Sequence, residues 1–176
     1  MTAPVTLPHP RRLYAMIRAC TTPATRAQAV LESLRACTGA GSGFLFLAKG
    51  NELLLMARTA DKTPPSGLQE EATRAWSQQP KTLSSDSTIA DTLTKLQIPR
   101  VNDEMALWTS GTGQAFGQRL LSIYRGSRWL AVGIAMLEPP QGKPLVSMHR
   151  VHVEALCNAL IDAGDVADAE LDPQPA

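Results

Sequence analysis

The chain has 176 residues, of which 44% are apolar, as is typical of one globular domain with a buried core. Its net charge is +1, so no overall electrostatic field would attract nucleic acid or an anionic membrane. Its longest apolar run, 129–137, is far shorter than the roughly 20 residues of a membrane-spanning helix, and no signal peptide is readable at its start. Three scattered cysteines are too few for a disulfide framework, so we expect a cytoplasmic protein with reduced thiols.

Two helices are predicted near the start of the chain. Residues 1–10 contain three prolines and no periodicity, which is typical of a linker or arm. Apolar residues then recur at helical spacing over 13–20. Thr22-Pro23 predicts the cap and first turn of a second helix, which Gly39 ends because glycine adopts the left-handed conformation without strain.

A hairpin and a third helix are predicted next. Two apolar runs, 43–48 and 52–58, flank a short turn that contains glycine, which is typical of a β-hairpin. Because their apolar residues are consecutive, we expect both faces of both strands to be covered. The run 66–69 is typical of a capping box, in which the Ser66 and Gln69 side chains each bond a backbone N–H, and it predicts a helix that ends near residue 80.

The middle segment, residues 81–114, carries the candidate ligand contacts. Its periodicity is weak, and we expect a short helix over 86–96 followed by a loop with a short strand. Ligand contacts concentrate in loops above a rigid scaffold. We therefore take as candidates five polar or aromatic residues of this segment: Asp86, Arg100, Asn102, Asp103 and Trp108. Trp108 would be a stacking wall and Arg100 a partner for an anion, and the alternative is that Trp108 fills the core.

A second hairpin and a last helix complete the predicted domain. Strands are expected over 118–124 and 129–137, and Gly133 inside the second strand indicates a bulge or a close backbone approach. The last helix is expected from about Pro144 to Ile161, with apolar residues on more than one face, so it should pack on two sides. The predicted domain thus spans residues 11–162.

Charge is unevenly distributed along the chain. Residues 1–60 hold seven basic and two acidic side chains, whereas 162–176 hold five acidic and no basic ones. We interpret the end of the chain, 163–176, as a solvated, disordered acidic tail. Attraction between the basic front and this acidic end, within the fold or across a dimer, is the alternative.

The order of the predicted elements, with two hairpins between helices, is an α+β layout with an antiparallel sheet. Residues 30–47, the hairpin that follows them, and residues 120–137 leading into the last helix resemble the corresponding parts of GAF domains. The resemblance covers about residues 11–162. It implies a GAF-like, PAS-related fold with a central antiparallel sheet and the N- and C-terminal helices on one face. The PAS fold itself is the competing interpretation, but it usually lacks so long an N-terminal helix.

The resemblance implies a non-catalytic sensory or regulatory module of signalling proteins. Such domains bind a small molecule between the sheet and the loops after the middle strands, or act without ligand as dimerisation or protein-docking modules. The cofactor is unknown, and Cys20, Cys37 and Cys157 fall outside the pocket segment, so we expect no covalent chromophore. Residues 110–121 resemble the acyl-CoA loop of N-acetyltransferases, but a strand rather than the required helix is expected after them, so this enzyme is the least favoured hypothesis.

The partners expected from the sequence are a second copy, a small-molecule ligand and a signalling protein. The terminal helices together would expose an apolar patch that a two-fold axis could bury, so we expect a homodimer through these helices. His149 and His152 lie three residues apart on the last helix. No third ligand shares their face, so we interpret them as surface or interface histidines and expect no metal.

Overall fold

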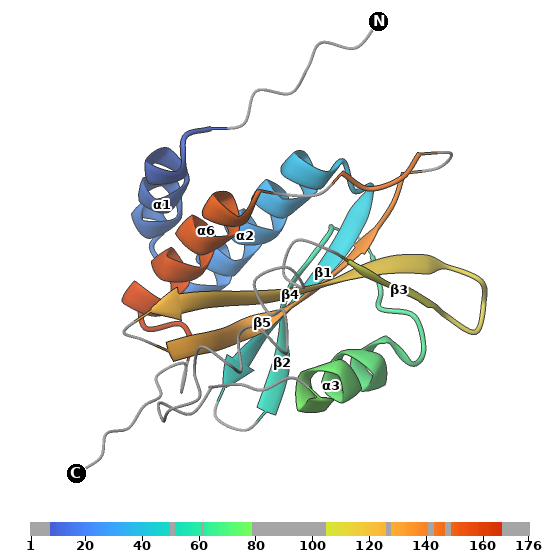
Figure 1. The fold of residues 1–176 in the computed structure, drawn as a ribbon. Helices are drawn as coiled ribbons and strands as arrows, with labels where there is room; N and C mark the ends of the chain where they lie inside the picture. Colours follow the sequence, from blue (N-terminus) through green and yellow to red (C-terminus); the bar gives the residue numbers. More distant parts are fainter. Residues whose placement is uncertain are drawn as a thin grey trace, which may run out of the picture.

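A central antiparallel sheet organises the fold (Figure 1). The computed structural model describes residues 8–49, 52–60, 62–78, 105–125, 128–140, 143–146 and 149–166. Within these residues the strands are β1 (Ser42–Lys49), β2 (Glu52–Arg58), β3 (Ala106–Thr109), β4 (Ala115–Arg125) and β5 (Arg128–Glu138). Their order in the sheet is β2-β1-β5-β4-β3 and every neighbouring pair is antiparallel, so the two predicted hairpins lie side by side.

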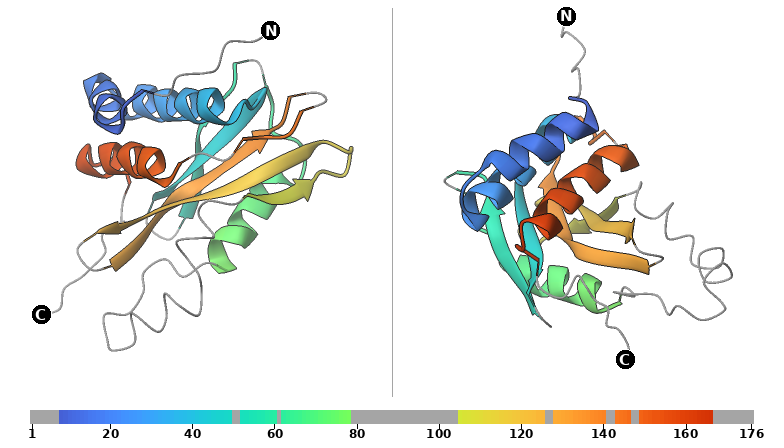
Figure 2. Two further views of the ribbon diagram at one scale, coloured as in Figure 1. Left: turned by 45° about the horizontal axis from the view of Figure 1, so that its top comes forward. Right: turned by 90° about the vertical axis from the view of Figure 1, so that its left-hand side faces the viewer.

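Helices cover both faces of this sheet (Figure 2). Three of them, α1 (Pro10–Ala19), α2 (Pro23–Thr38) and α6 (Arg150–Asp162), lie together on one face, and α3 (Leu68–Gln78) lies on the other. The expected α+β class, with the terminal helices on one face of an antiparallel sheet, is therefore confirmed. In the described part of the chain, no helix has both the length and the apolar character needed to cross a membrane.

The ends of α2 follow the chemistry predicted from the sequence. Thr22 caps the helix through a reciprocal pair of bonds with Thr25, in which each side-chain oxygen accepts from the other residue's backbone N–H at 3.1 Å. Pro23 occupies the first turn, where its missing N–H costs nothing. Gly39 ends the helix with a φ of +80°, the left-handed conformation expected of it.

The two strands of the first hairpin differ in burial. Residues of β1 are buried from Ser42 to Ala48, as expected for a strand covered on both faces. Burial in β2 is interrupted by exposed positions, and Leu54 is 40% exposed. The expectation that both faces of β2 are covered is therefore wrong: Glu52 and Leu54 point away from α3 and are exposed, so the helices on that face leave this part of the edge strand uncovered.

Gly133 lies where the backbones of β5 and β1 are in close contact. A Cβ on this residue would lie 2.1 Å from the carbonyl oxygen of Phe46, so no larger side chain fits without moving a strand. The register of β4 and β5 also shifts here, since Leu121 pairs with Gly133 but the next residue, Ser122, pairs with Ala131. Both a bulge and a close approach are thus present at the position that the sequence indicated.

Replacing Gly133 by alanine should therefore destabilise the fold by about 2–3 kcal/mol, the usual cost of forcing extra volume into a packed interior. The free energy of unfolding, measured by urea denaturation, tests this. Gly111→Ala is the matched control, because nothing lies within 4 Å of a Cβ built there. Equal stability of the two variants would contradict the close contact.

The last helix begins later than predicted. α6 starts at Arg150 rather than near Pro144. Residues 143–146 are not helical because they pack along the end of α2: the Val146 N–H donates to the Thr38 carbonyl at 2.9 Å. A Cβ on Gly117 would meet the Leu145 side chain, so this segment also lies against β4.

Helix α6 is packed on two sides within one chain. Val153, Leu156 and Leu160 are buried, and α6 packs against both α1 and β4. The α1 residues Leu13 and Ile17 are buried as well. The predicted packing of this helix on two sides is confirmed, and α1 supplies much of the cover that was expected from a second copy.

The acidic end of the chain meets the basic front inside the fold. The Asp165 carboxylate is 2% exposed and accepts two bonds from the Arg26 guanidinium, at 2.6 Å from Nε and 2.8 Å from Nη2. Lys49, at the end of β1, donates to the backbone carbonyl of Asp165. Asp162 accepts a bond from the Tyr14 hydroxyl at 2.7 Å. Packed structure therefore continues past residue 162 to Val166, and the rest of the expected acidic tail lies outside the described residues.

Candidate functional site

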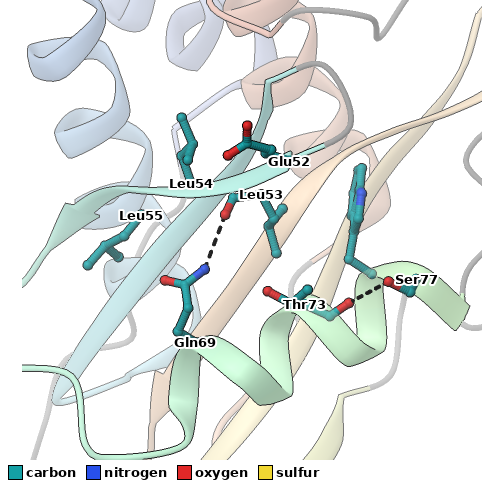
Figure 3. Close-up of a pocket in the computed structure, with 8 residues that line it drawn as sticks. Glu52, Leu53, Leu54, Leu55, Gln69, Thr73 and Ser77 are labelled. Carbon is teal, nitrogen blue, oxygen red and sulfur yellow. Dashed lines mark hydrogen bonds between the residues drawn. The ribbon is translucent and has the colours of Figure 1, made fainter.

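A hollow of about 390 Å³ lies between the edge strand β2 and helix α3 (Figure 3). Four consecutive residues of β2 and four residues of α3 line it: Glu52, Leu53, Leu54, Leu55, Gln69, Thr73, Trp76 and Ser77. Small-molecule sites commonly occupy about 300–1,000 Å³, so this hollow is large enough for a compact ligand.

Helix α3 presents two different rows of side chains. Its apolar row is buried against the sheet and consists of Leu68, Ala72, Ala75 and Trp76. Its polar row is exposed and lies on the side of the helix that lines the hollow. The residues of this row are spaced by four: Gln69, Thr73 and Ser77. The helix thus packs through one row and supplies the polar rim of the hollow through the other.

The start of α3 differs from the predicted capping box. Gly67, with a φ of +91°, precedes the helix, and its carbonyl accepts the Glu71 N–H at 2.9 Å. The Gln69 side chain does not return to the helix start. Its amide donates instead to the carbonyl of Leu53 at 3.1 Å and so connects α3 to β2 (Figure 3). The assignment of a capping role to Gln69 was wrong because β2 lies close enough to offer a free carbonyl.

The outer edge of β2 carries backbone groups that point away from β1. Lys49 pairs with Glu52, and in an antiparallel hairpin the mutually bonded pairs recur at alternate residues. Leu53 and Leu55 fall between these pairs, so their N–H and C=O groups point outward. The bond from Gln69 to the Leu53 carbonyl agrees with this orientation.

The interior of the hollow is apolar and uncharged. Leu53 and Trp76 are 5% and 3% exposed and form its buried wall. The ionisable residue among the eight is Glu52, whose side chain rises on the same side of β2 as Leu54, away from α3 (Figure 3). An anionic ligand would therefore find no cation among the lining residues.

Helix α3 is held against the sheet by a second polar contact. The Glu71 carboxylate accepts bonds from Arg74 at 2.5 Å and from Gln118, on β4, at 2.6 Å. The bond from Arg74 is the main cause that lowers the pKa of Glu71, burial opposes it, and Gln118 adds a smaller lowering. Because Gln118 belongs to the sheet, ionised Glu71 fixes the distance between α3 and the strands below it.

The lowered pKa of Glu71 predicts how stability depends on pH. In the unfolded chain this carboxyl titrates near its ordinary value of 4.5, and in the folded chain it titrates lower. Its contribution is therefore complete above pH 4.5 and is lost as the pH falls through the folded-state pKa. We expect Glu71→Gln to lower the free energy of unfolding at pH 7 and to make its decline below pH 4.5 shallower. Glu70→Gln, at an exposed neighbour, should change neither, and acid denaturation curves that coincide for wild type and Glu71→Gln would contradict the assignment.

The residues predicted from the sequence as ligand contacts are not brought together at this hollow. Trp108 lies on β3, half-buried, with its ring centroid 5.9 Å from that of Phe116 and its indole against Gly67. It is not among the eight lining residues. The other four candidates, Asp86, Arg100, Asn102 and Asp103, lie outside the described residues, so their role stays a prediction.

Cysteines and histidines are the residue types best suited to nucleophilic or metal chemistry. Burial raises the pKa of the Cys157 thiol to about 12 and also raises that of Cys37, so both are protonated at neutral pH. The His149 and His152 rings are 6.2 Å apart, and His152 Nε2 donates to the Pro8 carbonyl at 3.1 Å. Within the described ranges, no group of three or more potential metal-ligating side chains comes together.

Comparison with known proteins gives similarity to solved structures and no match of sequence. No protein-family model matches the sequence, and no curated protein matches it. Among solved structures, the chain is similar to the GAF domain from Acinetobacter phosphoenolpyruvate-protein phosphotransferase, with 11% sequence identity and a TM-score of 0.47 over 93% of this chain and 95% of that one.

Proposed function

We propose that this chain is a regulatory module that binds a small uncharged molecule in the hollow between β2 and α3. The observation that carries the proposal is the construction of the hollow, in which a buried Leu53–Trp76 wall meets a rim of exposed amide and hydroxyl groups. Small-molecule sites combine an apolar interior with a few polar groups that orient the ligand in this way. The resemblance of the sequence to GAF domains supports a regulatory role.

Binding rather than catalysis is favoured by the state of the reactive groups. A thiol acts as a nucleophile only as its thiolate, and Cys37 and Cys157 are held protonated and do not line the hollow. An acyl-CoA loop needs a helix after it, whereas the turn Ser110–Gln114 leads directly into β4. Both observations argue against the enzyme alternatives and support a binding module.

The position of the hollow supports a route for regulation. Its β2 wall begins at Glu52, and Lys49, three residues earlier, donates to the Asp165 carbonyl near the end of the described chain. Asp165 also holds Arg26 on α2. A ligand that displaces the start of β2 would therefore act on a contact that joins the hairpin, α2 and the C-terminal segment.

Filling the hollow should abolish binding without unfolding the protein. Thr73 is exposed and lines the hollow, so Thr73→Trp should occupy the space while changing the free energy of unfolding by less than about 1 kcal/mol. A panel of uncharged metabolites is screened by the rise in Tm that each causes, and hits are confirmed by calorimetry. We expect hits on the wild type to be lost in Thr73→Trp.

The matched control for this experiment is Glu70→Trp, which adds the same side chain to an exposed position of α3 outside the hollow. It should bind as the wild type does. Hits that survive in Thr73→Trp, or are lost equally in both variants, would contradict the proposed site.

Dimerisation through the terminal helices is a second candidate function. Met16 on α1 and Val151 on α6 are 47% and 45% exposed, and these two helices pack against each other. Exposed apolar side chains on neighbouring helices are typical of a surface that a second copy covers. We propose that the exposed faces of α1 and α6 form the contact between two copies.

Sedimentation at micromolar concentration tests the homodimer. The wild type should sediment as a dimer, and Val151→Glu should weaken the dimer at least about tenfold, because it places a charge on the proposed apolar contact face of α6. Val146→Glu is the control, since Val146 is also exposed, at 61%, but lies outside both helices. A monomeric wild type would contradict the proposal.

A further inference from the structure

The edge of β2 offers a recognition element inside the hollow. On an extended strand, the carbonyl of one residue and the N–H of the residue two positions later point to the same side. On the outer edge of β2 these groups are the Leu53 C=O and the Leu55 N–H. Both residues line the hollow, so a ligand seated there meets an acceptor and a donor that are fixed by the sheet.

One of these two groups is already occupied by a side chain of the protein. The Leu53 carbonyl accepts from the Gln69 amide at 3.1 Å, whereas no residue of α3 and no described loop supplies an acceptor for the Leu55 N–H. Gln69 is exposed, so its amide can exchange this bond for water at little net cost. The amide therefore occupies the place that an N–H group of a ligand would take.

In the described part of the chain, the row of β2 edge groups that a ligand could bond is short. The pairing of β1 and β2 shifts after Leu55, so that Leu45 pairs with Ala57 and Met56 is bulged. An added peptide strand needs a longer regular row than Leu53 and Leu55 provide. A compact ligand with one donor next to one acceptor needs only these two residues.

We propose, building on the proposed function, that the hollow selects an uncharged, planar heterocycle that carries an N–H donor beside a ring-nitrogen acceptor. The donor displaces the Gln69 amide from the Leu53 carbonyl, and the ring nitrogen accepts the Leu55 N–H. The flat apolar part of the ligand lies against the wall formed by Leu53 and Trp76. None of the eight described lining residues places a charge inside the hollow, so the uncharged form of the ligand is the one that binds.

A matched pair of probes tests this recognition. 4-Aminoquinazoline presents an exocyclic N–H beside a ring nitrogen, and 4-(dimethylamino)quinazoline has the same rings without the donor. In ¹⁵N–¹H spectra of the full chain, 4-aminoquinazoline should shift the Leu55 amide saturably at millimolar concentration, and Thr73→Trp should remove the shift. The dimethylamino compound should bind at least about fivefold more weakly, the usual effect of one lost hydrogen bond.

A variant of Gln69 tests the displacement. Gln69→Met keeps the length of the side chain but cannot donate to the Leu53 carbonyl, so it should bind 4-aminoquinazoline more tightly, by about fivefold at most. Glu70→Met, on the same helix outside the hollow, should bind as the wild type does. Weaker binding by Gln69→Met would show that Gln69 holds the ligand rather than competing with it, and would overturn the displacement.

The remaining outcomes separate this inference from the proposed function. If neither quinazoline shifts Leu55, or if both bind equally, recognition by the β2 edge is wrong. The proposed function still stands in that case if other hits of the metabolite panel are lost in Thr73→Trp. If the spectra instead respond to an extended peptide and to neither quinazoline, the edge adds a strand, and the proposed ligand class is overturned.

Discussion

The close packing of β1 against β5 is the constraint on which the rest of the fold depends. At Gly133 the two backbones come so near that the Phe46 carbonyl occupies the space of a Cβ. β1 is in turn buried from Ser42 to Ala48, so each of its faces needs a layer of its own. Helices α1, α2 and α6 supply one layer and α3 contributes to the other, which gives the order of layers seen in Figure 2.

The hollow forms at the edge of the sheet, where the layer containing α3 does not cover β2 completely. α3 packs through Leu68, Ala72 and Trp76, which cover the face of the sheet but leave the outer edge of β2 without a neighbouring strand. Exposed edges are normally protected by charge, by bulges or by a covering element. Here, among the described residues, the Gln69 side chain bonds the Leu53 carbonyl and the Gln28 side chain, on α2, bonds the Arg58 carbonyl, and the register shift next to Leu55 shortens the regular edge between them. Protection of the edge and access to the hollow are therefore controlled by the same few groups.

Local chemistry explains which parts of the fold could be predicted from the sequence. The cap at Thr22, the left-handed Gly39 and the bulge at Gly133 each depend on a residue type whose backbone or side-chain preference is strong, and all three are confirmed. The apolar residues before α6 have helical spacing, so the spacing predicts too early a start for this helix. In the structure Val146 packs against α2 and Leu145 against β4. That contact joins segments far apart in the chain, which spacing alone does not reveal.

The candidate site was less accessible to such reasoning. Polar residues at positions 69, 73 and 77 recur every four residues and could have indicated a polar row on the third helix. The sequence does not reveal, however, that this polar row faces the open edge of a strand, because the order of strands in the sheet depends on tertiary packing. Trp108, predicted as a ligand contact for its aromatic ring, lies against Phe116 and against Gly67 at the start of α3. Its role as a ligand contact stays a prediction.

The contacts of Asp165 also determine how the domain would bear mechanical load. A pull on the chain beyond Val166 reaches Asp165 before it reaches the end of α6. The force is then divided between the Arg26 guanidinium on α2 and the Lys49 ammonium at the tip of the first hairpin. Tension at this end is thus transmitted to the N-terminal half of the fold and to the hairpin whose second strand borders the hollow, and the last helix is not the first element to be pulled away.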